Sequence, residues 1–431
     1  MKNKLWLNKL FLLLFAPTLL CLAACSKDPP PTVDETTAPP SDSITGDKTT
    51  EPAVTEAPAL ADKADIFYPD IFDTWSTGAT CTSIIMIEHD EKYQGTMLCG
   101  FENWNMGLHP NICLPVYAST DGGATWKKRG AAVEQMDPSI YAYFNPCLYE
   151  LPEQIGDMPK GTLLLAGCSV DKGQTRKSAI SLYKSTNGGK SWKQISVCDT
   201  GKAPDFGVWE PYLITDGNGK LYCFYTSAAV DGYGSAVVYR TTENGVDWSE
   251  LKVVFGAAKT PEDRTGMPVI TKMGNGEYFM VYEYIPVVNG AKDNRVYCKT
   301  STDLSDWGDP NDPGTMVRST IRYMGAAPCC TWTPQGGDQG TLIVTAKFMS
   351  GNKYSDWFIS HDYGKTFETM ENPLKYSGKE KTGYRSSLFT TKDGTVIYAS
   401  AVDWNEDPLA KENSKGKISY AAISFNGKEQ K

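Results

Sequence analysis

The sequence predicts an all-β chain folded as a six-bladed β-propeller, and two regularities support this prediction. The first is an eight-residue phrase, Ser-Thr-Asp-Gly-Gly-Ala-Thr-Trp at Ser119–Trp126, which returns at Ser185, loosely at Thr241, shortened at Ser301 and again at Ser360. Successive copies start 66, 56, 60 and 59 residues apart, and a period of this size indicates a repeat architecture. The second is that short apolar runs rich in Val, Ile, Tyr and Phe fill the segments between the copies, as expected of strands.

The order of these runs predicts four strands in each repeat. In the third repeat they are Glu210–Thr215, Leu221–Thr226, Ala236–Thr241 and Leu251–Phe255, with the phrase between the third and the fourth. Four such strands make one blade of a propeller. The sixth repeat has only three strand-like runs, so we expect Asp65–Ile71 to supply its outer strand and close the ring. The six repeats start near Ala79, Tyr143, Trp209, Met267, Ala326 and Arg385.

The repeated phrase has the composition of a tight hairpin turn. Asp121 or Asn187 can accept hydrogen bonds from nearby backbone amides, the glycines that follow permit positive φ, and the closing aromatic ring packs beneath the turn. The phrase resembles the Asp-box of the sialidase-like β-propellers. That resemblance implies the fold and says little about the chemistry.

The N-terminal residues predict export. Residues 1–24 have a basic start, an apolar run too short to span a membrane and a small-residue end, which is typical of a signal peptide. The sequence Leu22-Ala23-Ala24-Cys25 resembles the bacterial lipobox. This implies cleavage before Cys25, lipidation of that cysteine and anchoring at the extracellular face of a bacterial cell membrane. The alternative is an ordinary secreted protein with a chance cysteine.

Two further segments follow from composition. Residues 25–63 are rich in Pro, Thr, Ser and Ala with almost no large apolar side chain, so they predict a disordered tether. Residues 64–431 form the predicted six-bladed catalytic domain, which we expect to be a monomer.

Charge and cysteine usage exclude several classes of partner. The net charge of −9 becomes −12 when the signal peptide, with its three lysines, is removed. No basic stripe appears, so nucleic acid is excluded as a partner and a neutral ligand fits better. The ten cysteines beyond Cys25 lack CxxC spacing and the chain has three histidines, so we predict buried free thiols, no metal site and no cofactor.

Propeller geometry predicts where the site lies. The start of each blade's first strand and the end of its second strand meet at one face, and the repeated turns lie at the other. A concave central position of this kind is where a ligand binds by default. Acidic and aromatic residues dominate there, as a sugar site requires. The residues predicted to bind substrate are Glu102, Trp104, Tyr143, Trp209, Arg264, Tyr284, Tyr384, Arg385, Asp403 and Trp404.

Two acids at this face are the predicted catalytic residues. Glu210 and Glu283 are isolated charges in strongly apolar strand contexts, in neighbouring repeats. A carboxyl in such a place is costly unless it is paired or functional, and its pKa tends to rise. The alternative is that either acid anchors a loop backbone.

Several stretches resemble the exo-α-1,5-L-arabinanases of glycoside hydrolase family 93. They are Trp209-Glu210-Pro211, Gly266-Met267-Pro268-Val269 with Tyr282-Glu283, Ala326-Ala327-Pro328 with Trp332-Thr333-Pro334, and Pro146–Pro152. The resemblance implies a retaining hydrolase that releases arabinobiose from the end of linear arabinan, with Glu210 and Glu283 as its two catalytic glutamates. The more apolar neighbours of Glu283 favour it as acid/base and leave Glu210 as nucleophile.

Two other functions remain open at this point. A sialidase would share the propeller, but the family's first substrate-binding arginine lies in the first blade, and this chain has no arginine before Arg129. A non-catalytic carbohydrate-binding propeller would need the aromatic residues but not two convergent acids.

Overall fold

The computed structural model describes residues 58–68, 76–105, 113–133, 141–171, 177–202, 207–257, 262–351, 355–374, 381–404 and 415–426. All of them belong to one unit, Glu56–Lys431. They form strands, turns and loops without a helix. No helix in this part of the chain is long and apolar enough to cross a membrane.

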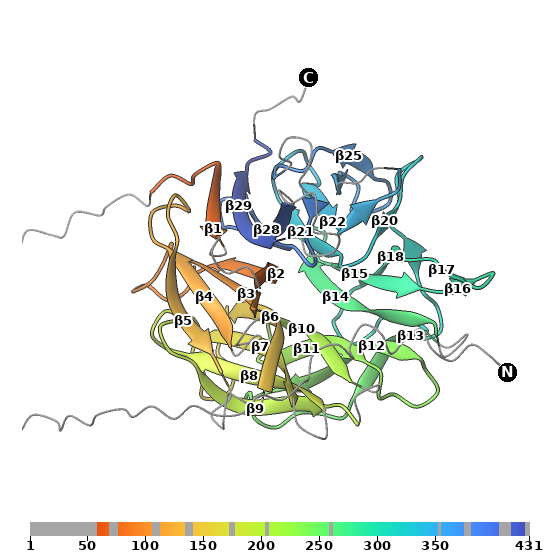
Figure 1. Cartoon of the computed structure of the whole chain (residues 1–431), viewed down its shortest axis with the longest axis horizontal. Helices are drawn as coiled ribbons and strands as arrows, with labels where there is room; N and C mark the ends of the chain where they lie inside the picture. The colour runs from red at the N-terminus through yellow and green to blue at the C-terminus, as the bar shows by residue number, and fades with distance from the viewer. Residues whose placement is uncertain are drawn as a thin grey trace, which may run out of the picture. The chain divides into compact units, whose positions relative to one another are not determined.

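The strand pairings give six four-stranded blades, and Figure 1 shows that the blades surround a central axis. This confirms the predicted six-bladed β-propeller. In the first five blades the strands pair antiparallel in chain order, and in the sixth the order is β27-β28-β29-β1. The strands of the first three blades are β2 (Ser76–Met86), β3 (Met97–Asn105), β4 (Leu114–Ser119) and β5 (Lys127–Ala132); β6 (Tyr141–Glu150), β7 (Leu163–Asp171), β8 (Ser178–Ser185) and β9 (Lys193–Thr200); and β10 (Val208–Thr215), β11 (Leu221–Ser227), β12 (Ser235–Thr242) and β13 (Lys252–Ala257).

The remaining blades contain shorter strands and three additional pairings. The hairpin β16 (Val287–Val288) and β17 (Ala291–Lys292) extends from the fourth blade, β20 (Met324–Gly325) pairs with β23 (Phe348–Met349), and β26 (Lys381–Thr382) pairs with β28. The blade strands are β14 (Arg264–Lys272), β15 (Tyr278–Ile285), β18 (Arg295–Ser301) and β19 (Thr315–Met316); β21 (Cys329–Thr333), β22 (Thr341–Thr345), β24 (Trp357–Ser360) and β25 (Glu368–Met370); and β27 (Ser387–Thr390), β28 (Val396–Trp404) and β29 (Lys415–Ile423) with β1 (Lys63–Phe67).

The predicted ring closure is confirmed. β1 pairs antiparallel with β29 and supplies the outer strand of the sixth blade, with Ala64 opposite Tyr420. The amide of Ala61 also donates to the carbonyl of Gly122 at 2.8 Å. The chain therefore already contacts the first blade before residue 64.

The repeated turns at Ser119 and Ser185 share one hydrogen-bond pattern, and the turn at Ser360 has its two bonds from backbone amides to side chains. In the first, between β4 and β5, Asp121 Oδ1 accepts from Thr125 N at 2.9 Å and Ser119 Oγ accepts from Gly123 N at 2.9 Å. The indole of Trp126 donates to Gly123 O at 3.0 Å beneath the turn. The turn at Ser185–Trp192 repeats these bonds. These turns join third to fourth strands, as predicted.

The core lies between the blades. Leu98 and Leu114 of the first blade pack with Leu148 and Leu165 of the second in one buried cluster. All ten cysteines in the described part of the chain are free thiols, and each is buried except Cys113, which is half-buried.

Each blade also has a non-glycine residue with positive φ near the start of its inner strand, called here a left-handed residue because its backbone lies in the left-handed region. In the first four blades this residue lies at a bulge, where the register with the second strand shifts. Such a backbone costs about 1–3 kcal/mol outside glycine, so it persists only where neighbouring contacts hold it. The left-handed residues, with their φ values, are Cys81 (51°), Asn145 (51°), Glu210 (61°), Met267 (59°), Ala326 (61°) with Ala327 (47°), and Arg385 (53°).

Candidate active site

Glu210 lies at the left-handed position of the third blade, near the start of β10. One carboxylate oxygen, Oε2, accepts hydrogen bonds from Thr226 Oγ1 at 2.5 Å and from the backbone amide of Met267 at 3.0 Å. The other oxygen, Oε1, has no hydrogen-bond partner among the described residues. Glu210 is half-buried, so one oxygen is held by its own blade and by the next blade, while the other is available to a ligand.

Glu283 lies in β15 of the fourth blade. Its Oε2 accepts from the amide of Ala327 in the fifth blade at 3.2 Å. Burial, and next the negative charge of Glu210, raise the pKa of Glu283 from 4.5 to about 7. The Ala327 amide, the Arg264 cation and the side chain of Asn294 oppose this shift. A carboxyl in this state is largely protonated below pH 7.

Gly266 lies between these two acids. It is the cross-strand partner of Glu283 in the pairing of β14 with β15. A Cβ at Gly266 would lie 2.5 Å from Thr226 Oγ1 and 3.1 Å from Glu210 Oε2. The close approach of Glu210 to this strand is therefore possible because residue 266 has no side chain. The two predicted catalytic carboxyls converge on this part of the molecule.

A third carboxylate, Glu102 in β3, has the equivalent register position in the first blade. It opposes Thr80, the residue before left-handed Cys81, as Glu283 opposes the residue before left-handed Met267. Glu102 is 3% exposed, and its Oε1 accepts from the backbone amide and the side-chain amide of Asn145 at 2.8 and 3.1 Å. It is therefore a buried anchor between two blades, which corrects the prediction that it binds substrate.

The three acids share a structural role that the sequence did not reveal. Glu102, Glu210 and Glu283 each accept a hydrogen bond from a backbone amide in the next blade. In each case the donor is a residue with positive φ. The recurrence of a glutamate in three blades is the sequence signal that could have indicated this role. The sequence cannot identify the partner, because a backbone amide is present at almost every residue.

Two predicted substrate-binding tyrosines lie in the core instead. Tyr143 is 1% exposed and belongs to the cluster between the first two blades. Tyr284 is 5% exposed, and its ring contacts Phe255 and Tyr297 with centroids 5.1 and 5.5 Å apart. Because neighbouring residues of a strand face opposite sides, Tyr284 points away from the side of the sheet that carries Glu283. Both predictions are corrected.

Tyr384 is the aromatic residue that best fits the site. It is 36% exposed, and Lys347 Nζ lies 4.6 Å from its ring centroid. Burial raises its pKa first, followed by the negative charges of Glu283 and Glu210. The hydroxyl is therefore neutral at physiological pH and lies close to both acids. Trp209 is half-buried and packs edge-on against Phe144 at 6.1 Å.

The two predicted arginines differ in their surroundings. Arg264 is exposed, and its charge opposes the rise in the pKa of Glu283; its contact with substrate stays a prediction. Arg385 is 5% exposed, and its Nη2 donates to the carbonyl of Pro211 at 3.0 Å. The prediction that Arg385 contacts substrate is corrected, because its guanidinium is covered by protein.

The other predicted residues are described less fully or not at all. Trp104 and Asp403 with Trp404 lie at the ends of β3 and β28, as predicted, and only their backbone is described. Cys25 lies outside the described residues.

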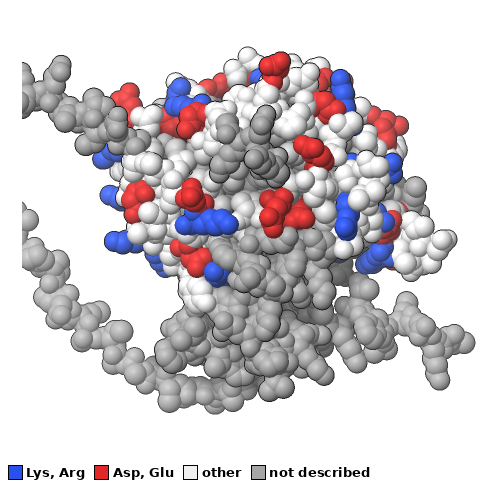
Figure 2. All heavy atoms as spheres, turned by 90° about the horizontal axis from the view of Figure 1, so that it is seen from above, with Lys and Arg blue, Asp and Glu red and all other residues white. Residues whose placement is uncertain are grey.

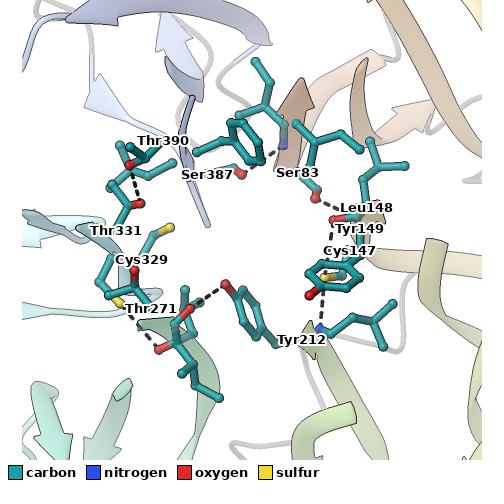
Figure 3. A pocket seen from close by; sticks show the side chains of 18 of the residues that line it. Ser83, Cys147, Leu148, Tyr149, Tyr212, Thr271, Cys329, Thr331, Ser387 and Thr390 are labelled. Carbon is teal, nitrogen blue, oxygen red and sulfur yellow. Dashed lines mark hydrogen bonds between the residues drawn. The ribbon is translucent and has the colours of Figure 1, made fainter. Parts of the chain in front are cut away.

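A cavity of about 330 Å³ lies along the axis of the ring, and Arg385 is the left-handed residue that lines it. Figure 3 shows its wall, to which the inner strand of every blade contributes. Neither Glu210 nor Glu283 lines it, so this channel is distinct from the acid pair. One lining residue from each blade is Ser83, Cys147, Tyr212, Thr271, Cys329 and Ser387.

On the face in Figure 2, acidic and basic side chains are interspersed, and no continuous basic stripe crosses the described residues. Within the described ranges, no group of three or more His, Cys, Asp or Glu side chains could hold a metal ion.

Solved structures match the chain over its folded part, whereas no protein-family model and no curated protein matches it. An α-L-arabinanase of Penicillium chrysogenum in complex with arabinobiose is 27% identical, with a TM-score of 0.71, over 85% of this chain and 99% of that one. The α-L-arabinofuranosidase of Fusarium graminearum with arabinobiose, from glycoside hydrolase family 93, is 25% identical, with a TM-score of 0.71, over 84% of this chain and 98% of that one. The predicted resemblance to family 93 is confirmed.

These matches also confirm the prediction of a glycoside hydrolase. A Hadza microbial sialidase is 13% identical, with a TM-score of 0.54, over 84% of this chain and 68% of that one. That likeness concerns the fold alone.

Proposed function

We propose that this protein is a retaining, exo-acting glycoside hydrolase that releases arabinobiose from α-1,5-linked L-arabinan. The observation that carries the proposal is the pair of unlike carboxyls, Glu210 and Glu283, on either side of Gly266. Pairs of acids whose environments separate their pKa values are typical of glycosidases, in which one acts as acid and the other as nucleophile.

Glu210 suits the nucleophile. Its Oε2 is held by Thr226 and the Met267 amide, whereas Oε1 has no described partner. A carboxylate held at one oxygen can direct the other at the anomeric carbon and form the glycosyl ester of a retaining mechanism.

Glu283 suits the general acid and then the general base. With a pKa of about 7 it carries the proton that the leaving oxygen needs. Part of that elevation comes from the charge of Glu210. When Glu210 becomes an ester its charge disappears, so the pKa of Glu283 falls and the deprotonated carboxylate can activate water for the second step.

The substrate class is supported by the site and by the two hydrolase structures that contain arabinobiose. Tyr384 offers exposed aromatic surface to a sugar ring. Arg264 and Lys347 lie beside the acid pair or the tyrosine, where they can donate hydrogen bonds to sugar hydroxyls.

The test is incubation of the purified propeller with linear arabinan, with product analysis and NMR assignment of the first anomer formed. Arabinobiose released with retained configuration is the expected result. Endo products, an inverted anomer, or cleavage of sialosides with arabinan left intact would contradict the proposal. A crystal structure adds a geometric check, since retention requires carboxyls about 5–5.5 Å apart and inversion needs about 6.5–9.5 Å.

The proposed location is the extracellular face of a bacterial cell membrane, through a lipid on Cys25, with the enzyme acting as a monomer. Metabolic labelling with a fatty acid tests the anchor. Label and membrane fractionation should both be lost in Cys25→Ser; a variant that stays in the membrane fraction without label would contradict lipidation. Light scattering of the purified propeller tests the monomer.

A further inference from the structure

Arg385 connects two opposite blades through the centre of the ring. Its carbonyl accepts the amide of Thr82 in the first blade at 2.9 Å. Its Nη2 donates to the carbonyl of Pro211 in the third blade at 3.0 Å. The sixth and third blades face each other in a six-bladed ring, so this side chain spans the axis between the acid pair and the axial channel.

The environment of this guanidinium is unusual for a buried cation. Arg385 is 5% exposed, and its Nη1 is buried without a hydrogen-bond partner among the described residues. None of the ion pairs between described side chains includes it. A buried charge is costly unless it is compensated. Arg385 lines the channel of about 330 Å³, and its Nη2 donates to a single peptide carbonyl.

That carbonyl belongs to the residue directly after Glu210. Glu210 has a left-handed backbone with φ of 61°, which a proline at the next position restricts further. A strained backbone of this kind persists only where several contacts determine it. The side-chain bonds of Glu210 to the third and fourth blades fix its carboxylate on one side, and Arg385 fixes the following peptide from the opposite side of the ring.

The charges of Arg385 and Glu210 both affect the pKa of the same two buried cysteines. Burial raises the pKa of the thiols of Cys81 and Cys168; the charge of Arg385 opposes this rise and the charge of Glu210 adds to it. For Glu283, by contrast, the cation that acts on the carboxyl is Arg264.

We propose that Arg385 is a positioning residue for Glu210: by holding the Pro211 carbonyl across the axis, it keeps the left-handed Glu210 and its free oxygen directed at the anomeric carbon. This inference rests on the proposed function, because it assigns Glu210 the nucleophilic step. It predicts that loss of the guanidinium slows formation of the glycosyl ester while substrate binding changes little.

The experiment compares Arg385→Met, Arg385→Lys and a matched control, Arg129→Met, with wild type. Arg129 also donates from its guanidinium to a backbone carbonyl of a neighbouring blade, Gly188 O at 3.0 Å, and lies away from the acid pair. Activity is measured on linear arabinan and on an aryl arabinobioside with a good leaving group, and each rate is normalised to the folded fraction.

Arg385→Met should lower kcat about 10- to 100-fold on both substrates, with KM within about threefold of wild type. Arg385→Lys, which can keep one donor, should recover part of the rate, and Arg129→Met should retain full activity. A good leaving group relieves the need for the acid but not for the nucleophile, so it should not rescue Arg385→Met. The rate of covalent labelling by a mechanism-based inhibitor should fall by the same factor.

Rescue of Arg385→Met by the good leaving group, a kcat within twofold of wild type, or equal losses in Arg385→Met and Arg129→Met would overturn the inference. If Arg385→Met does not fold, the Lys variant decides: unchanged kcat and unchanged labelling rate would contradict a positioning role. If wild type cleaves neither substrate, the proposed function itself fails, which is a separate outcome.

Discussion

The backbone amide of Ala327 donates to the carboxyl of Glu283 at 3.2 Å, across the boundary between the fourth and fifth blades. Ala327 is itself in the left-handed region, with φ of 47°. The proposed acid is therefore held by the backbone of a neighbouring repeat, and its geometry depends on how the blades are packed rather than on its own strand.

The first prediction concerns the role of Glu283. Glu283→Gln removes the proton donor, so hydrolysis of arabinan should fall about 10²- to 10⁴-fold. Hydrolysis of an aryl arabinobioside with a good leaving group should fall much less in the first step. Steady-state and burst kinetics on both substrates check this, with added azide as an external nucleophile. Equal losses on both substrates would contradict the acid/base assignment.

The second prediction follows from the pKa of Glu283, which rises from 4.5 to about 7 on folding. The folded chain then binds more protons than the unfolded chain between these two values, so this group lowers the free energy of unfolding as pH rises through that window. Glu283→Gln lacks the group and should gain stability relative to wild type from about pH 4.5 to about pH 7. Denaturant unfolding across that range measures the difference, and a difference that does not change with pH would refute the cause.

The third prediction concerns Gly266. In Gly266→Ala the new methyl group would lie 2.5 Å from Thr226 Oγ1 and 3.1 Å from Glu210 Oε2, so both groups must shift. Because misplacement of about 1 Å can cost about 10²-fold in rate, kcat should fall steeply while the fold persists. Gly100→Ala is the control, since its nearest neighbour would be Leu148 Cδ1 at 3.5 Å. Equal activity in the two variants would show that the space at Gly266 is not needed.

The fourth prediction separates two uses of Tyr384. Its exposed ring beneath Lys347 should contact the sugar, so Tyr384→Ala should raise KM about 3- to 10-fold, in line with the loss of one aromatic contact. Tyr384→Phe keeps the ring and should bind as wild type does. Initial rates over a range of arabinobioside concentrations distinguish the cases; a large loss in the Phe variant would point to the hydroxyl instead.

Much of the fold was predictable because its signals are local. The third-blade strands predicted at Glu210–Thr215 and Leu221–Thr226 are observed as β10 and β11 within two residues at each end. Turn composition and apolar runs depend on neighbouring residues, so one sequence is enough to show them. The resemblance to family 93 rested on short motifs of the same local kind.

The errors arose where a residue's role depends on its surroundings. Tyr284 was predicted beside the substrate although it follows Glu283 directly in an extended strand, where alternation alone places it on the other face. Glu102 and Glu283 have equivalent register positions, yet Glu102 is buried and accepts two hydrogen bonds, from the backbone amide and the side-chain amide of Asn145. The residues that surround each acid come partly from the adjacent blade, Asn145 for Glu102 and Ala327 for Glu283.

The sequence by itself determined the repeat, the six blades, the ring closure and the two acids worth testing, because periodicity and isolated charges in apolar strands are properties of the chain alone. Only the tertiary structure decided that Gly266 makes room for Glu210, that the next blade holds each acid, and that Arg385 reaches Pro211 across the axis. These contacts join residues from 44 to 174 positions apart. They form when curved sheets close into a ring, and nothing in the neighbouring residues specifies them.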